Sequence, residues 1–398
     1  MTNITSIIFI IAITFLSLFS IHLLNKIFKI PLKSVKHESI EGLRGYLAFF
    51  VFIHHAIIYY YYLRTNHWNI PNSKLFNHFG ETSVVLFFMI TSFLFVSKLL
   101  NQTTKTDWTK LFTSRILRIY PAFLLLFIIQ IILIFYISDF QFIESPMYVF
   151  KEIIIWLGFS IIDYLPINGY KDTNLMTANV LWTIRYEWVF YFSLPLLSLI
   201  ISKHKPNILI VLFTISIMCA IANYIQLQIV FLYTFAGGVL AAFAVNNHSI
   251  KKYATKSTTS ILVLGCLTMV ILCFDTAYSL IPICILTIAF IGIACGNTLF
   301  GILTLKISKL FGQLSYSIYL FHGIVLYFIF IIVIGFKTAS HFSVIEHWLV
   351  VSTCCLLVVL MATICFKWIE QPCINSSIQI SIKLKEFFSK KLKSGRSS

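Results

Sequence analysis

The chain has 398 residues, of which 59% are hydrophobic and only 11% are charged, and its formal net charge is +16. This composition excludes a soluble globular protein, because apolar runs long enough to cross a bilayer core recur along the chain. The weak period-2 pattern of a membrane β-barrel is not seen. The sequence therefore predicts an all-α polytopic membrane protein.

We predict about eleven membrane-spanning helices, and a shorter apolar segment at 152–162 that is too brief to cross. The first helix is expected to be retained, because it lacks a basic start and a clear small-residue cleavage site. The expected organisation is an extra helix with a basic linker (1–37), a membrane domain (38–373) and a basic cytoplasmic tail (374–398). The predicted spans are 6–24, 44–63, 82–99, 119–137, 180–202, 208–225, 228–245, 259–275, 280–296, 312–335 and 346–367.

The positive charge is a topology signal and does not indicate nucleic-acid binding. One set of alternate loops holds 24 Lys and Arg residues, and the other set holds five. Positive residues favour the cytoplasmic side, which predicts a cytoplasmic C-terminus and an external N-terminus. The basic tail is expected to lie on the lipid of the cytoplasmic leaflet. On the outer side, the long segment at about 138–179 is expected to cover a substrate entrance.

All nine cysteines fall at or after Cys219, mostly within apolar segments. No CxxC pair and no Cys/His spacing typical of zinc appears among them. They are interpreted as small buried hydrophobic residues, and no metal is expected.

The stretch GLRGYLAFFVFIHHA (42–56) places ionisable side chains inside a predicted span. Eleven residues advance a helix by about 1100°, so His55 lies under the same face as Arg44 and about 16 Å deeper. His54 points to a different face. A neutral buried imidazole can act as a general base, which makes His55 a candidate catalytic residue. A hydrogen bond to a neighbouring helix is the structural alternative.

A second cluster is SRILRIYP (114–121), at the cytoplasmic start of a span. Arg115 and Arg118 are three residues apart and share a helix face. Such a pair can hold phosphate groups through bidentate hydrogen bonds. Ordinary positive-inside anchoring is the alternative interpretation.

Three further segments carry buried ionisable groups. NVLWTIRYEWVFYFSLP (179–195) contains Arg185 and Glu187, which point to different faces, and Glu81 is a candidate partner for Arg185. GQLSYSIYLFHG (312–323) places His322 about ten residues into a span, near mid-membrane. FKWIEQP (366–372) places Glu370 at the cytoplasmic exit of the last span. Structural roles are the alternatives for all three segments.

In their order along the chain, these motifs resemble those of the membrane acyltransferase-3 family, over about residues 38–373. They are Arg44 followed by His55, GETSVVLFFMITSFL (80–94), SRILRIYP, LWTIRYEW, LSYSIYLFH and WIEQP. Family members move acyl groups, commonly acetyl from acetyl-CoA, to hydroxyls of cell-envelope glycans. Without the helix at 6–24, the chain keeps ten spans with both ends cytoplasmic, which matches the family topology.

The resemblance implies roles for individual residues. His55, Glu187 and His322 are expected to be catalytic, with His55 acting either as a general base or as an acyl carrier. Glu187 and His322 are expected to shape the outer half of a tunnel. The remaining assignments place Arg44, Arg115 and Arg118 on the phosphates of acetyl-CoA and Trp182, Arg185 and Tyr316 on the acceptor.

The sequence departs from the family pattern at a few positions. Glu41 stands where an aspartate is usual, Thr91-Ser92-Phe93-Leu94 replaces Ser-Gly-Phe-Leu, and Thr183 follows the tryptophan. Because Ser92 replaces the glycine of that motif, the resemblance does not predict how the chain packs at this position.

The implied function is an O-acetyltransferase of a bacterial inner membrane. Its acceptor would be a lipid-linked glycan such as lipopolysaccharide O-antigen. Alternative acceptors are peptidoglycan, an exopolysaccharide or another lipid-linked molecule. The sequence does not decide whether the acyl group is acetyl. A transporter or flippase for a lipid-linked sugar is the alternative from another class, although no inverted repeat is seen.

Overall fold

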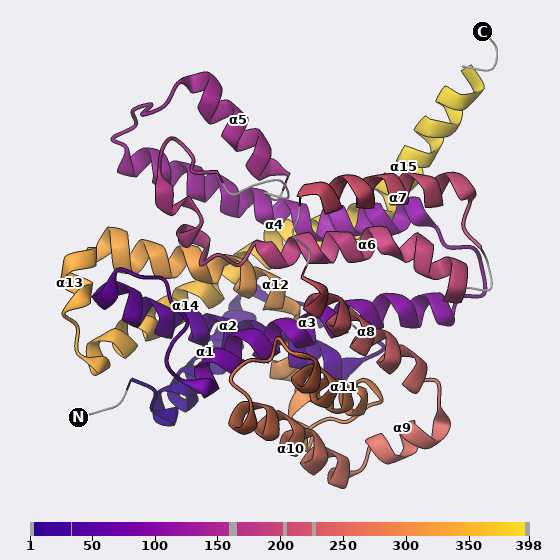
Figure 1. The fold of residues 1–398 in the computed structure, drawn as a ribbon, viewed down its shortest axis with the longest axis horizontal. Helices are drawn as coiled ribbons and strands as arrows, with labels where there is room; N and C mark the ends of the chain where they lie inside the picture. Colours follow the sequence, from indigo (N-terminus) through magenta and orange to yellow (C-terminus); the bar gives the residue numbers. More distant parts are fainter. Residues whose placement is uncertain (1–3, 33, 159–164, 202–204, 225–227, 395–398) are drawn as a thin grey trace.

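The computed structural model describes residues 4–32, 34–158, 165–201, 205–224 and 228–394, and within these ranges the regular structure is helical (Figure 1). The α-helices are α1 (Ile7–Phe28), α2 (Glu38–Thr65), α3 (Lys74–Leu100), α4 (Trp108–Ile137), α5 (Pro146–Leu157), α6 (Trp182–Ile201), α7 (Ile208–Tyr224), α8 (Ile229–Ala244), α9 (His248–Ala254), α10 (Ser257–Cys273), α11 (Leu280–Ala294), α12 (Lys306–Tyr327), α13 (Phe336–Ser340), α14 (Val344–Cys365) and α15 (Gln371–Ser394). Short 3-10 helices are η1 (Lys171–Thr173), η2 (Leu175–Thr177) and η3 (Ile302–Thr304), and π-helical turns are η4 (Phe328–Val333) and η5 (Phe366–Glu370).

Each of the eleven predicted spans coincides with a helix, and the prediction of an all-α polytopic membrane protein is confirmed. Among the described residues, seven helices are long and apolar enough to cross a membrane. An eighth span is reached if α8 and α9, which meet at a bend of 103°, count as one. Three other predicted spans form α7, α10 and α11, of 17, 17 and 15 residues. At a rise of 1.5 Å per residue they are at most about 26 Å long, somewhat short of a bilayer core of about 30 Å.

Helices α2, α3 and α12 form the centre of the bundle, with α8, α10 and α11 on one side and α4 and α6 on the other (Figure 1). Helix α2 approaches α12 closely because glycines lie at the crossing. A Cβ atom on Gly45 would lie 2.6 Å from the backbone of Phe311, and one on Gly312 would lie 1.7 Å from the carbonyl oxygen of Glu41. Membrane helices approach closely where small residues meet in this way. The contact fixes how the side chains of α2 face those of α12.

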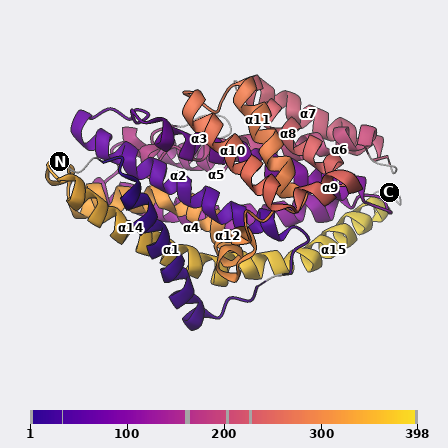
Figure 2. The ribbon, with the colours of Figure 1, turned by 90° about the horizontal axis from the view of Figure 1, so that it is seen from below.

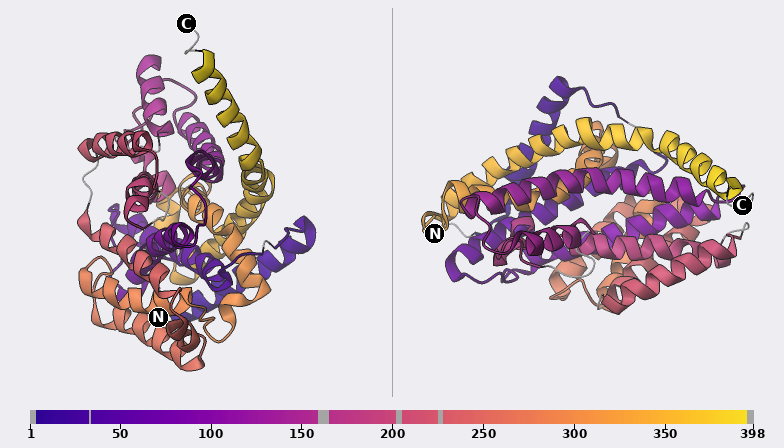
Figure 3. Two further views of the ribbon diagram at one scale, coloured as in Figure 1. Left: turned by 90° about the vertical axis from the view of Figure 1, so that its right-hand side faces the viewer. Right: turned by 90° about the horizontal axis from the view of Figure 1, so that it is seen from above.

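The extra N-terminal helix packs at the edge of the bundle. Helix α1 lies against α14 (Figure 2). Phe9 stacks there on Trp348, at a centroid distance of 5.2 Å. Helix α14 continues through η5 into α15, which runs beside α4 (Figure 3, right). The C-terminal segment is therefore packed against the start of α4.

Asn168 organises the described part of the long segment at 138–179. Its side-chain oxygen accepts from the Ile143 amide at 2.9 Å, and its side-chain amide donates to the Gln141 carbonyl at 2.9 Å. Its backbone amide donates to Glu152 on α5 at 3.0 Å. Asn168 is fully buried and has a φ of 52°, a left-handed conformation that asparagine tolerates well. The residue joins α5 to the chain on both sides of it.

We expect Asn168→Ala to loosen this segment, because the hydrogen bonds of this side chain to Gln141, Ile143 and Glu144 are lost. The expected cost is about 1–3 kcal/mol, measured as a lower unfolding temperature and faster limited proteolysis between residues 141 and 170. The matched control is Asn66→Ala, since Asn66 has a φ of 56° and an exposed side chain. Equal effects of the two variants would mean that backbone strain, and not the buried hydrogen bonds, dominates.

Candidate active site

Three cavities follow one another between α2, α3, α4, α6 and α12. The first, which we call the arginine cavity, has a volume of about 340 Å³ and is lined by Arg44, Arg115, Arg118 and Glu187. The second, the middle cavity, measures only about 60 Å³. The third, the histidine cavity, measures about 220 Å³ and contains His55 in its wall.

Shared wall residues join the three cavities into one series. The arginine and middle cavities share Arg44, Phe87, Glu187 and Tyr316. The middle and histidine cavities share Val84 and Tyr319. Arg44 and His55 therefore stand at successive levels of one series, as their shared helix face predicts.

The arginine cavity concentrates positive charge. The Arg44 guanidinium lies 3.5 Å from the Glu41 carboxylate. The Arg115 guanidinium lies over the ring of Phe95, 5.1 Å from its centroid. Glu187 accepts a hydrogen bond of 3.0 Å from the Tyr191 hydroxyl, which orients its carboxylate. Because three guanidiniums meet two carboxylates here, the cavity suits an anionic ligand.

His55 and His322 form a hydrogen-bonded pair between α2 and α12. Their atoms Nδ1 and Nε2, respectively, are 3.0 Å apart. His322 Nδ1 lies 2.7 Å from the Tyr319 carbonyl oxygen, and His55 Nδ1 lies 3.0 Å from the Val51 carbonyl oxygen. His322 is fully buried and His55 is 8% exposed.

These contacts determine where the protons lie. A carbonyl oxygen only accepts, so His322 carries its proton on Nδ1, and in the neutral ring Nε2 is then an acceptor. His55 Nδ1 must therefore donate to it, and the contact with the Val51 carbonyl requires the same proton. The Nε2 atom of His55 is left with its lone pair. That atom can take a proton from a hydroxyl group.

His54 has a different role from His55, although it also lines the histidine cavity. Its Nδ1 atom donates to the Phe76 carbonyl at the start of α3, at 2.7 Å. Its ring packs so closely on Gly80 that a Cβ atom there would lie 2.6 Å from it. His54 therefore packs α2 against α3.

Two tyrosines of α12 tie the site to neighbouring helices. The hydroxyl of Tyr319 lies 2.9 Å from that of Thr183 at the start of α6. The hydroxyl of Tyr316 donates to the Ile119 carbonyl on α4 at 2.8 Å. Tyr319 also supplies the carbonyl that orients His322. Its part in the site was not predicted, although it lies within LSYSIYLFH, one helical turn before His322.

The predicted acceptor residues divide between the cavities. Trp182 lines the histidine cavity, and Tyr316 lines the middle and arginine cavities. Arg185 lies on α6 and is not among the described residues that line the three cavities.

Glu187 lies beside Arg44 in the arginine cavity, and not in the outer half where the sequence interpretation placed it. The position of Glu187 around its own helix does not show which neighbouring helix its carboxylate faces.

Glu81 has partners other than the predicted Arg185. Its carboxylate accepts from the Thr276 hydroxyl at 2.6 Å and from the Ala277 amide at 2.7 Å. Glu81 thereby anchors the connection between α10 and α11 to α3, and it lines the histidine cavity. The hypothesis of a Glu81–Arg185 pair is replaced by this contact, because a buried carboxylate is satisfied by the nearest donors.

Comparison with known proteins identifies the family of this chain. A family model described as an acyltransferase domain matches residues 37–367. Nothing matches among curated proteins, and nothing matches among solved structures. The match covers more than half of the chain, and it includes both the arginine cluster and the two histidines. The chain therefore belongs to the acyltransferase-3 family and is a membrane acyltransferase.

Proposed function

We propose that this acyltransferase moves an acetyl group from cytoplasmic acetyl-CoA to a hydroxyl of a cell-envelope glycan, such as a lipid-linked O-antigen in a bacterial inner membrane. The observation that carries the proposal is the series of cavities that leads from the arginine cluster to the lone pair of His55. A polyanionic donor with a long neutral arm fits this arrangement. Its phosphates would bind in the arginine cavity, and its thioester would reach His55.

In the proposed mechanism His55 acts as a general base. Its Nε2 atom takes the proton of the acceptor hydroxyl while that oxygen attacks the thioester carbonyl carbon. The carbon–sulfur bond then breaks, and the CoA sulfur leaves with the proton that His55 holds. His322 accepts from His55 Nδ1–H and keeps the ring oriented through both steps.

Glu187 is best interpreted as a positioning residue. Its carboxylate lies in the arginine cavity, held by Tyr191, where it can orient the guanidiniums that bind phosphate. Trp182 and the outer part of the histidine cavity would take the sugar, since an aromatic ring offers a flat apolar face.

The direct test supplies the purified protein in liposomes with labelled acetyl-CoA and candidate lipid-linked glycans. Label on the glycan, with release of free CoA, is the expected result. Movement of the glycan across the bilayer without acetyl transfer would instead identify a flippase. Label retained on His55 without an acceptor would show that His55 carries the acetyl group.

We expect Arg115→Ala to raise the apparent KM for acetyl-CoA about tenfold or more, because a charge-assisted contact with phosphate is lost. The value of kcat should change less, since Arg115 lies far from the thioester in this arrangement. Arg115→Lys should recover only part of the affinity, because lysine keeps the charge but not the planar fork.

Lys337→Ala is the matched control for that measurement. It removes a positive charge from an exposed position on α13, outside the three cavities. An unchanged KM in Arg115→Ala, or an equal rise in the control, would contradict the phosphate role.

A further inference from the structure

A fourth cavity lies beside the arginine cavity, in the connection between α3 and α4. We call it the lysine cavity; it has a volume of about 310 Å³, and its cationic lining residues are Lys98, Lys105, Lys110 and Arg115. It shares Phe95, Lys98 and Arg115 with the arginine cavity. The two cationic spaces are therefore direct neighbours.

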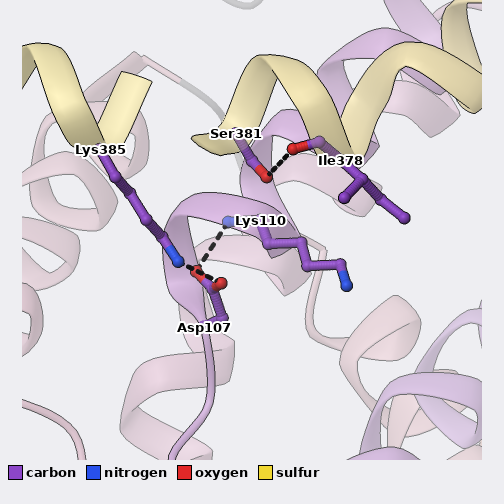
Figure 4. Close-up of polar contacts among 5 residues, drawn as sticks. All are labelled: Asp107, Lys110, Ile378, Ser381 and Lys385. Atoms are coloured by element: carbon purple, nitrogen blue, oxygen red, sulfur yellow. Dashed lines mark hydrogen bonds and ion pairs between the residues drawn. The ribbon is translucent and has the colours of Figure 1, made fainter. Parts of the chain in front are cut away.

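Asp107 is the acidic residue in this lining, and its charge is already engaged. It caps α4 by accepting from the Lys110 backbone amide at 3.0 Å, and it forms an ion pair with Lys385 on α15 (Figure 4). Burial acts to raise the pKa of Asp107, but the hydrogen bonds from Lys385 and the Lys110 amide outweigh it and lower that pKa. The carboxylate is thus ionised and neutralised by the tail helix.

The lysines of the cavity keep an excess of positive charge. Among the described residues, the ion pairs do not include Lys98, Lys105 or Lys110. Lys98 lines this one cavity together with Lys110 and Arg115, so like charges lie near one another. Such a cluster is relieved by an anion bound between its members.

We propose that the lysine cavity binds the ribose phosphate at the nucleotide end of the donor, an inference that rests on the proposed function. Acetyl-CoA carries two separated anionic groups, a diphosphate and a 3′-phosphate on the ribose. Two adjacent cationic cavities offer one site for each group: the arginine cavity takes the diphosphate, and the lysine cavity takes the ribose phosphate. Lysines bind such a group as point charges.

Helix α15 takes part in this site through Asp107. Without Lys385 the Asp107 carboxylate would face the bound phosphate unscreened. Lys385→Ala should therefore weaken donor binding, although Lys385 itself is outside the lining. Asp107→Asn in the Lys385→Ala background should restore binding, because asparagine caps a helix as well as aspartate does. Lys383→Ala on the same helix is the control for loss of tail charge.

The test compares acetyl-CoA with acetyl-dephospho-CoA, which lacks only the 3′-phosphate. The wild-type protein should have a lower apparent KM for acetyl-CoA, and Lys105→Ala/Lys110→Ala should reduce that preference about tenfold. The variant should bind acetyl-dephospho-CoA almost as the wild type does. Lys252→Ala, an exposed lysine on α9, should keep the preference.

Equal apparent affinity of the wild-type protein for the two donors would overturn the nucleotide site and leave the proposed function intact. An effect of the lysine variants that is equal for both donors, and that appears only in vesicles with anionic lipid, would identify a lipid-headgroup site and also overturn it. Transfer from neither donor would reject the proposed function, and the inference with it.

Discussion

Replacing His55 with alanine should abolish acetyl transfer, with a loss of about 10²–10⁴-fold or more in kcat. His55 Nε2 is the atom of the histidine pair that keeps a lone pair, because His55 Nδ1–H is committed to Val51 and His322. The measurement is the initial rate of labelled acetyl transfer in liposomes at saturating acetyl-CoA.

His54→Ala is the matched control and should keep most of the activity. His54 directs its own Nδ1–H to the Phe76 carbonyl, so its loss affects packing against α3 and leaves the base in place. The reverse pattern, with an inactive His54 variant and an active His55 variant, would overturn the assignment of the base.

His322 is tested through the hydrogen bond that it accepts. His322→Ala should lower kcat, and His322→Gln should recover part of it, because a glutamine oxygen can accept from His55 Nδ1–H. A positioning role predicts that His322→Ala also shifts the pH–rate profile of the enzyme. Equal kcat values and unchanged profiles for both variants would show that His322 only packs in the core.

Gly312→Ala should cause a large loss of stability, since a Cβ atom at this position would lie 1.7 Å from the Glu41 carbonyl oxygen. Overpacking of this kind costs about 1–3 kcal/mol, and more where backbone must move. The protein that still folds should also transfer acetyl slowly, because α2 and α12 carry the two halves of the histidine pair. Thermal unfolding in detergent and the specific activity of the monodisperse fraction measure the two effects.

Gly265→Ala is the matched control for this substitution. Gly265 lies in α10, and no atom lies within 4 Å of a Cβ atom built on it. Alanine should leave the unfolding temperature unchanged or raise it slightly, because it favours a helix more than glycine does. Similar unfolding temperatures for Gly312→Ala and Gly265→Ala would show that the α2–α12 contact is not tight.

The sequence was sufficient for the helices and for the placement of Arg44 and His55 along α2. The length of an apolar run predicts a membrane span because the thickness of the bilayer sets the length of a crossing helix. Each predicted span coincides with a helix. Helical phase placed Arg44 and His55 in one series of cavities, since both lie on α2 and their relation depends only on helix geometry.

Relations between helices were beyond the sequence, because they depend on packing and register. The hydrogen bond between His55 and His322 joins residues 267 positions apart. Glu187 was placed too far from the arginines, and Glu81 was assigned the wrong partner, since phase within α6 or α3 does not show which helix lies opposite. The lysine cavity forms where the end of α3 folds back onto the start of α4, and in the sequence its lysines look like ordinary positive-inside residues.

The small volume of the middle cavity has a consequence for the energetics of the host membrane. A passage of full width between the two faces would let protons and small cations flow down their gradients and dissipate the membrane potential. The middle cavity holds only about 60 Å³, and Phe87, Phe88 and Tyr319 stand in its wall together with Arg44 and Glu187. A hydrated ion would have to shed most of its water shell to enter so small a space, which is costly. A slender neutral chain has no such shell to lose, so a cavity of this size favours the arm of the proposed donor over a hydrated ion.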